Sequence, residues 1–338
     1  MSNPKIQQTK VTLNQVEQKI SHVPVVNFIY LFLKRNMGVL IGFLLLSLAL
    51  VFSTDKFLTI DNTVNILRQV SINAILAIGI TCTLLTIGVD LSIGSTVAMS
   101  GVMAVTMIST GFPVAIACLA ALAAGALAGL FNGFIISRTG MPAFIVTLAT
   151  QNVIRGFAYV ATGGQPITSS NETFNYIGNG YIGPVPVPII IMVAVAIVVS
   201  IVLTKTKFGR HMYATGGNKE AAIYSGLHVK NIQMSVYIIS GLLAALAGIM
   251  LAARMYSGQP TTGVGYEGDA VAAAVLGGTS FTGGVGTIGG TMIGALVIGV
   301  LNNGMNLLKI PYYYQLVVKG LVILGAVYVD TVKKRQKV

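Results

Sequence analysis

The residues of this chain that could do chemistry are few, and long apolar segments separate them. The three histidines, His22, His211 and His228, all lie in polar segments, and none has the His-Glu-x-x-His spacing of a zinc site. The two cysteines, Cys82 and Cys118, lie within apolar runs and are typical of small core residues. We therefore expect no catalytic residue, no metal site and no disulfide on this chain.

A phosphate-binding loop is also missing from the sequence. The Gly-x4-Gly-Lys-Ser/Thr pattern that cradles nucleotide phosphates does not occur, and no glycine is followed directly by lysine. If ATP drives the activity of this chain, another polypeptide must bind the ATP and its magnesium ion. We expect no cofactor on this chain itself.

Asp90 separates two apolar runs with almost no loop between them, in the segment Gly88-Val89-Asp90-Leu91-Ser92. Asp90 or Ser92 could accept hydrogen bonds from the first free N–H groups of the next helix. A carboxylate at membrane depth could instead belong to a solute pathway or a gate. Both interpretations stay open, although capping alone accounts for an aspartate here.

Three amides lie within apolar segments, at Asn132, Asn302 and Asn303. Such side chains could hydrogen-bond a polyhydroxylated solute as it crosses the membrane. More often they bond neighbouring helices. These three residues and Asp90 are therefore the candidate residues of a solute pathway or gate.

The segment 204–231 is basic and lies between two apolar stretches. Its pattern predicts a short helix with an N-cap, an acidic first turn, two helix formers and a glycine terminator. These features fall, in that order, at Asn218, Glu220, Ala221, Ala222 and Gly226. A rigid helix between two membrane spans could transmit a push from a docked partner, whereas the alternative is a solvated loop.

The composition indicates the surroundings that these residues need. Of the 338 residues, 54% are hydrophobic and 9% are charged, whereas a soluble domain has about 25% charged residues. The net charge of +12 could indicate nucleic acid binding, but lysine and arginine gather in the two tails and in the segment 204–231. This asymmetry is typical of the cytoplasmic loops of a membrane protein. We expect a lipid bilayer, and no nucleic acid, as a partner.

Ten apolar segments are candidates for membrane helices, which need about 20 apolar residues each. They cover residues 37–52, 70–89, 93–110, 112–136, 142–161, 187–203, 232–253, 270–281, 288–308 and 313–329, and the eighth is short or broken. An even number places both basic tails in the cytoplasm, as the positive-inside rule requires. The predicted organisation is a cytoplasmic tail over 1–35 with a possible interfacial helix, a transmembrane domain over 36–330, and a basic cytoplasmic tail over 331–338.

An internal similarity suggests how the spans are arranged. Gly125-Ala126-Leu127 precedes Asn132-Gly133, and Gly294-Ala295-Leu296 precedes Asn303-Gly304. The two sets lie five spans apart, which predicts two inverted five-helix halves, as in many transporters. Because Gly-Ala-Leu is common in membrane helices, chance similarity is the alternative. The fold class is thus an all-α integral membrane protein with about ten transmembrane helices, some of them broken.

Several motifs in a fixed order resemble a known family. They are Thr86-Ile87-Gly88-Val89-Asp90-Leu91-Ser92-Ile93-Gly94-Ser95, Gly217-Asn218-Lys219-Glu220-Ala221-Ala222, Gly265-Tyr266-Glu267, Val275-Leu276-Gly277-Gly278-Thr279-Ser280 and Leu301-Asn302-Asn303-Gly304-Met305-Asn306. Together they resemble the ribose-type permeases of bacterial ATP-binding-cassette importers, over residues 51–330. One departure is Val285, where many relatives have lysine or arginine.

The resemblance implies a multi-pass permease of the bacterial inner membrane that imports ribose or a related monosaccharide. It implies three partners, namely a cytoplasmic ATP-binding subunit, an external solute-binding protein and a second permease, which we expect to be another copy of this chain. It also implies that the 204–231 segment meets the ATPase. The candidate coupling residues are Arg210, Asn218, Glu220, Ala221, Ala222 and Gly226.

Two other functions are the alternatives. An ion-coupled secondary transporter needs carboxylates deep within its spans, and Asp90 is the only one that we expect there. A membrane enzyme is disfavoured by the scattered histidines. Neither explains the ordered motifs.

Overall fold

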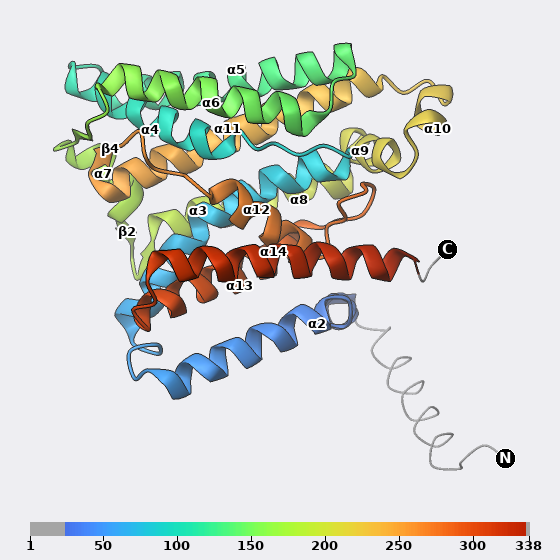
Figure 1. Ribbon diagram of the computed structural model, residues 1–338, viewed down its shortest axis with the longest axis horizontal. Coiled ribbons are helices and arrows are strands. Elements are labelled where there is room, and N and C mark those ends of the chain that lie inside the picture. The colour runs from blue at the N-terminus through green and yellow to red at the C-terminus, as the bar shows by residue number, and fades with distance from the viewer. Residues whose placement is uncertain (1–23, 336–338) are drawn as a thin grey trace.

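The computed structural model describes residues 24–335, so the outer parts of both predicted tails, 1–23 and 336–338, lie outside the described residues. Long helices pack side by side along the long axis of the molecule (Figure 1). The longer helices are α2 (Pro24–Ser53), α3 (Ile60–Leu85), α4 (Ile93–Ser109), α5 (Val114–Thr139), α6 (Ala143–Thr162), α8 (Val187–Lys205), α11 (Val229–Met255), α13 (Ile288–Leu307) and α14 (Tyr312–Arg335). The shorter ones are α7 (Glu172–Asn179), α9 (Lys207–Gly217), α10 (Lys219–Tyr224) and α12 (Tyr266–Leu276).

Strands are minor elements of the described part. Strands β1 (Ile167–Thr168) and β4 (Ser257–Gly258) form one antiparallel pair, and β2 (Tyr181–Ile182) and β3 (Val185–Pro186) form another. Within the described residues, 6 helices are long and apolar enough to cross a membrane: α3, α5, α6, α8, α11 and α13. Shorter apolar stretches lie in α2, α4 and α14. The predicted class, an all-α integral membrane protein, is confirmed.

Several helices extend beyond the predicted apolar segments because polar turns precede or follow the spans. Helix α3 begins at Ile60, where the hydroxyl of Thr59 accepts a hydrogen bond of 3.3 Å from the Asn62 N–H and caps the first turn. Helix α12 begins at Tyr266 and therefore includes Asp269. The predicted domain boundary at residue 35 falls inside α2, and α14 continues past residue 330.

Helix α11 lies at the centre of the bundle and packs against α3, α4 and α5. A side chain on Gly129 of α5 would overlap the Tyr237 carbonyl of α11, and Gly125 and Gly241 face each other in the same way. These glycines let the two helix backbones approach closely. The glycine stripe of α5 is therefore used for packing within this one chain.

The two ends of the bundle differ in what they carry. Helices α9 and α10, the N-terminal end of α2 and the C-terminal end of α14 lie at one end (Figure 1). Helix α7, which the sequence did not predict, and strands β2 and β4 lie at the other (Figure 1). The Asn179 amide donates to the Ala253 carbonyl over 3.0 Å, so α7 covers the last turn of α11.

Candidate functional site

A polar cavity of about 380 Å³ lies among α3, α11, α12, α13 and α14. Its polar lining residues are Gln69, Asn73, Arg254, Tyr266, Asp269, Asn302, Asn306, Gln315 and Lys319. Arg254 is in the last turn of α11 and Tyr266 begins α12, so the cavity lies toward the end that carries α7. Hydroxyl-rich solutes need many hydrogen-bond donors and acceptors, and amide, carboxylate and ammonium groups supply both.

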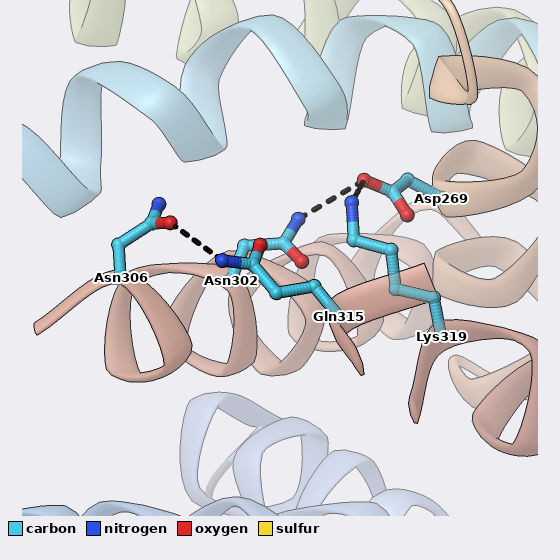
Figure 2. A network of polar contacts seen from close by, with 5 residues as sticks. All are labelled: Asp269, Asn302, Asn306, Gln315 and Lys319. Carbon is cyan, nitrogen blue, oxygen red and sulfur yellow. Dashed lines mark hydrogen bonds and ion pairs between the residues drawn. The ribbon is translucent and has the colours of Figure 1, made fainter. Parts of the chain in front are cut away.

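Asp269 contacts two other side chains of this polar lining (Figure 2). Its Oδ2 accepts hydrogen bonds from Asn302 Nδ2 over 3.0 Å and from Lys319 Nζ over 2.9 Å. The Asp269 side chain is 5% exposed and that of Lys319 is 25% exposed. Three helices, α12, α13 and α14, thus meet at one carboxylate oxygen, and the ammonium group that faces it stays within reach of the cavity.

The cavity lining also contains an oxygen without a hydrogen-bond partner and an amide bonded to two neighbouring groups. The Oδ1 of Asn302 is buried and has no hydrogen-bond partner. Gln315 Nε2 donates to Asn306 Oδ1 over 3.1 Å and to the Ile310 carbonyl over 2.8 Å (Figure 2). A buried carbonyl oxygen without a donor is costly, so Asn302 would gain a hydrogen bond if a small shift of its side chain let a solute hydroxyl reach this oxygen.

Asp269 corrects one expectation from the sequence. Asp90 was expected to be the only carboxylate deep within the spans, but Asp269 is also buried inside a helix. The prediction is wrong because the apolar segment in the sequence begins at residue 270, whereas α12 begins four residues earlier, at Tyr266, and so includes Asp269. Lys319 lies 50 residues further along the chain, and such a pairing has no local signal in the sequence.

Asp90 is fully buried at the break between α3 and α4. Its Oδ1 accepts hydrogen bonds from the Ser92 N–H over 3.0 Å and the Ser92 hydroxyl over 2.6 Å, and its Oδ2 accepts one from Ser240 over 2.8 Å. Asn132 donates to the Ser92 hydroxyl over 2.9 Å. Ser92 is the N-cap residue of α4 but makes no side-chain capping bond. Asp90 therefore ties the helix break to α11, and through Ser92 to α5.

The structure separates Asn303 from its neighbour Asn302. Asn303 is buried, and it exchanges hydrogen bonds of 2.8 Å and 3.2 Å with Asn62 at the start of α3. It does not line the cavity around Asp269. Of the four candidate pathway residues, the cavity therefore contains only Asn302, while Asp90 and Asn132 form a separate buried cluster.

The basic segment 204–231 forms two helices, α9 and α10, instead of one. Asn218 Oδ1 accepts a hydrogen bond of 2.9 Å from the Ala221 N–H and caps α10, and Glu220 is in the first turn. Gly226 follows the helix with a φ of 80°. Ala222 packs inward, whereas the other candidate coupling residues, Arg210, Asn218, Glu220, Ala221 and Gly226, are exposed. They form a surface to which a partner could bind.

The end of α9 contacts two other parts of the bundle. A side chain on Gly216 would overlap the Leu85 carbonyl at the end of α3, and Gly284 N–H donates to that same carbonyl over 3.1 Å. Tyr213 donates to the Gly286 carbonyl over 2.9 Å. We call these contacts the Gly216 junction. It connects the exposed α9–α10 surface to α3 and to the turn between α12 and α13.

Comparison with known proteins agrees with these features. Residues 62–327 match the family model described as "Branched-chain amino acid transport system / permease component". The ribose import permease protein RbsC of Escherichia coli (strain K12) is 46% identical over 296 residues, which cover 86% of this chain and 92% of that protein. RbsC of Bacillus subtilis (strain 168) is 44% identical over 321 residues, covering 94% of this chain and 98% of that protein. No solved structure matches the chain.

A more distant relative is named for a different pentose. The L-arabinose ABC transporter permease protein AraH of Azospirillum brasilense is 38% identical over 303 residues, covering 90% of this chain and 89% of that protein. Permeases of this family work with a partner ATPase and a solute-binding protein, and ATP hydrolysis belongs to the ATPase. The chain therefore belongs to this permease family and is a ribose-type, multi-pass inner-membrane subunit of an ATP-binding-cassette importer, not an enzyme.

Proposed function

We propose that this chain moves ribose or a related monosaccharide inward across the membrane, driven by a separate ATPase. The main structural support is the polar cavity around Asp269, whose amide, carboxylate and ammonium groups can hydrogen-bond a neutral polyol. The names of the most similar relatives support the sugar. Asp269 is a second buried carboxylate, such as an ion-coupled secondary transporter would need, but membership of the importer permease family favours the ATP-driven function.

The α9–α10 end faces the cytoplasm in this proposal, with both chain termini on the same side. Helices α2 and α14 have their outer ends there (Figure 1), and the basic segment 204–231 lies there too, in agreement with the positive-inside rule. The cavity around Asp269 then opens toward the outer side, where a solute-binding protein delivers its sugar.

We further propose ten membrane helices in two inverted halves, with α2–α6 in one and α8, α11, α12, α13 and α14 in the other. Helices α5 and α13 hold the similar Gly-Ala-Leu segments. The C-terminal end of α5 and the N-terminal end of α13 both lie near the α9–α10 end, as the positions of Arg138 and Gly284 indicate. The two helices therefore run in opposite directions, as inverted repeats require.

Transport would begin when the ATPase binds ATP and pushes on the exposed residues of α9 and α10. The Gly216 junction would pass this motion to α3 and to the α12–α13 turn, and the helices would alternate access to the cavity. The partner holds the ATP and magnesium. Two copies of this chain form the permease pair, in preference to one copy with a related permease.

The substrate is tested by uptake into cells that lack their own ribose permease and express this chain with its two partner proteins. We expect radiolabelled ribose or another pentose to accumulate, and leucine, which the family description suggests, to stay outside. Accumulation of leucine without any pentose would contradict the sugar assignment. The matched control is the same strain with the ATPase partner omitted.

A further inference from the structure

A second cavity, of about 440 Å³, lies between α10 and the facing ends of α5 and α11. Its charged and titratable lining residues are all basic: Arg138, Lys219, His228 and Lys230. None of the described residues that line it is acidic. The cavity is therefore electropositive, and an anion would be attracted to it.

The cavity lies where two candidate membrane spans end. Arg138 is in the last turn of α5 and Lys230 is in the first turn of α11, and both helices are candidate membrane spans. Helix α11 has His228 as its N-cap residue, without a side-chain capping bond. The N-terminus of this helix adds positive partial charge on the same side.

Apolar side chains complete the lining. Ile223 and Leu227 lie in the cavity wall. Phe131 and Phe134, in the turns of α5 just before Arg138, are exposed, and most of that helix is not covered by the rest of the chain. The site is thus charged at the membrane surface and continues into an apolar, lipid-facing flank.

We propose that this cavity binds the phosphate group of a membrane phospholipid, with preference for an anionic lipid. Its place in the inner leaflet rests on the orientation proposed above. On α10, Lys219 and Ile223 face the cavity, whereas Glu220 and Tyr224 point to another side and are exposed. A lipid and the ATPase can therefore occupy different faces of the same helix. The bound lipid would contact the face of α10 that carries Lys219 and Ile223.

The absence of tryptophan from the sequence allows a direct test. The full chain with Ile223→Trp is placed in nanodiscs that contain a small fraction of lipid with brominated acyl chains, which quench tryptophan fluorescence on contact. We expect brominated phosphatidylglycerol to occupy the site about 25-fold more strongly than brominated phosphatidylcholine, because two nearby cations contribute about fivefold each.

The variant Arg138→Gln/Lys230→Gln should lose this preference, and the matched control Lys205→Gln/Lys207→Gln should keep it, because those exposed lysines do not line the cavity. Equal quenching by both lipids would overturn the proposal. Displacement of the lipid by the ATPase subunit would also overturn it and would assign the cavity to that interface. Displacement by inorganic phosphate at millimolar concentration would overturn it as well and would assign the cavity to a soluble anion. If the tryptophan variant does not fold, native mass spectrometry of the unmodified chain measures the same lipid preference.

Discussion

Lys319 of α14 donates a hydrogen bond of 2.9 Å to Asp269 of α12, and the same carboxylate oxygen accepts one from Asn302 of α13. One buried acidic oxygen therefore holds three helices together at the wall of the polar cavity. If these helices move relative to one another during transport, this ion pair must break or move with them. The pair is consequently both a structural contact between helices and part of the cavity lining.

Replacing Asp269 with asparagine should lower sugar uptake at least about tenfold, because Lys319 loses its charged partner and a buried hydrogen-bonded charge pair is costly to break. Initial rates of ATP-driven uptake measure the effect. The control is Asp55→Asn, which removes an exposed carboxylate and should leave uptake unchanged. Unaltered uptake by Asp269→Asn would remove Asp269 from the pathway.

Replacement by leucine should have different effects at Asn302 and at Asn303. Asn302→Leu should raise the KM or lower the rate of uptake while the unfolding temperature stays near that of the wild type. Asn303→Leu should lower stability by about 1–3 kcal/mol, because the buried Asn62 Oδ1 loses its hydrogen-bond donor. Thermal unfolding and uptake kinetics are measured for both, and the same response from both would show that the two sites are not distinct.

Asp90→Asn should retain most of the transport activity. Asparagine keeps the oxygen that Ser92 approaches, and its amide can donate to the Ser240 hydroxyl, so the helix break stays tied to α11. Asp90→Ala should destabilise the protein by about 1–3 kcal/mol, because it leaves Ser240 without this partner. If Asp90→Asn folds normally but stops transport, Asp90 acts through its charge, as a gate or an ion site would.

Gly216 and Gly217 offer a matched pair for the Gly216 junction. A methyl group on Gly216 would overlap the Leu85 carbonyl, whereas one on Gly217 meets nothing within 4 Å. Gly216→Ala should therefore separate α9 from α3 and reduce ATP-driven uptake at least about tenfold, and Gly217→Ala should behave as the wild type. The assay also records ATP hydrolysis, because normal hydrolysis with lost uptake would locate the defect in transmission.

Local patterns predicted the parts of this protein whose structure depends on neighbouring residues. Asn218, Glu220 and Gly226 have the predicted places in α10 because capping and termination are decided within one turn of helix. Long apolar runs likewise gave most of the membrane helices. Helices α9 and α7 were missed because both are short and lack the long apolar run of a membrane helix.

Contacts between residues that are far apart in the sequence could not be predicted from local patterns. Neighbouring amides on α13 point about 100° apart. The position of α3 decides that Asn303 meets Asn62, and the position of α12 decides that Asn302 meets Asp269. The sequence likewise gave no sign that Ser240 approaches Asp90. Placing the candidate pathway therefore required the packing of all the helices around the cavity.

The central claim is that this chain is a passive permease that a partner's ATP cycle opens. The most direct measurement is sugar uptake by proteoliposomes that contain this chain, its ATPase and its solute-binding protein, with ATP, proton gradient or sodium gradient supplied separately. We predict uptake with ATP alone, and loss of uptake but not of ATP hydrolysis in Glu220→Ala/Gly226→Ala. Uptake driven by an ion gradient in vesicles that contain only this chain would contradict the account.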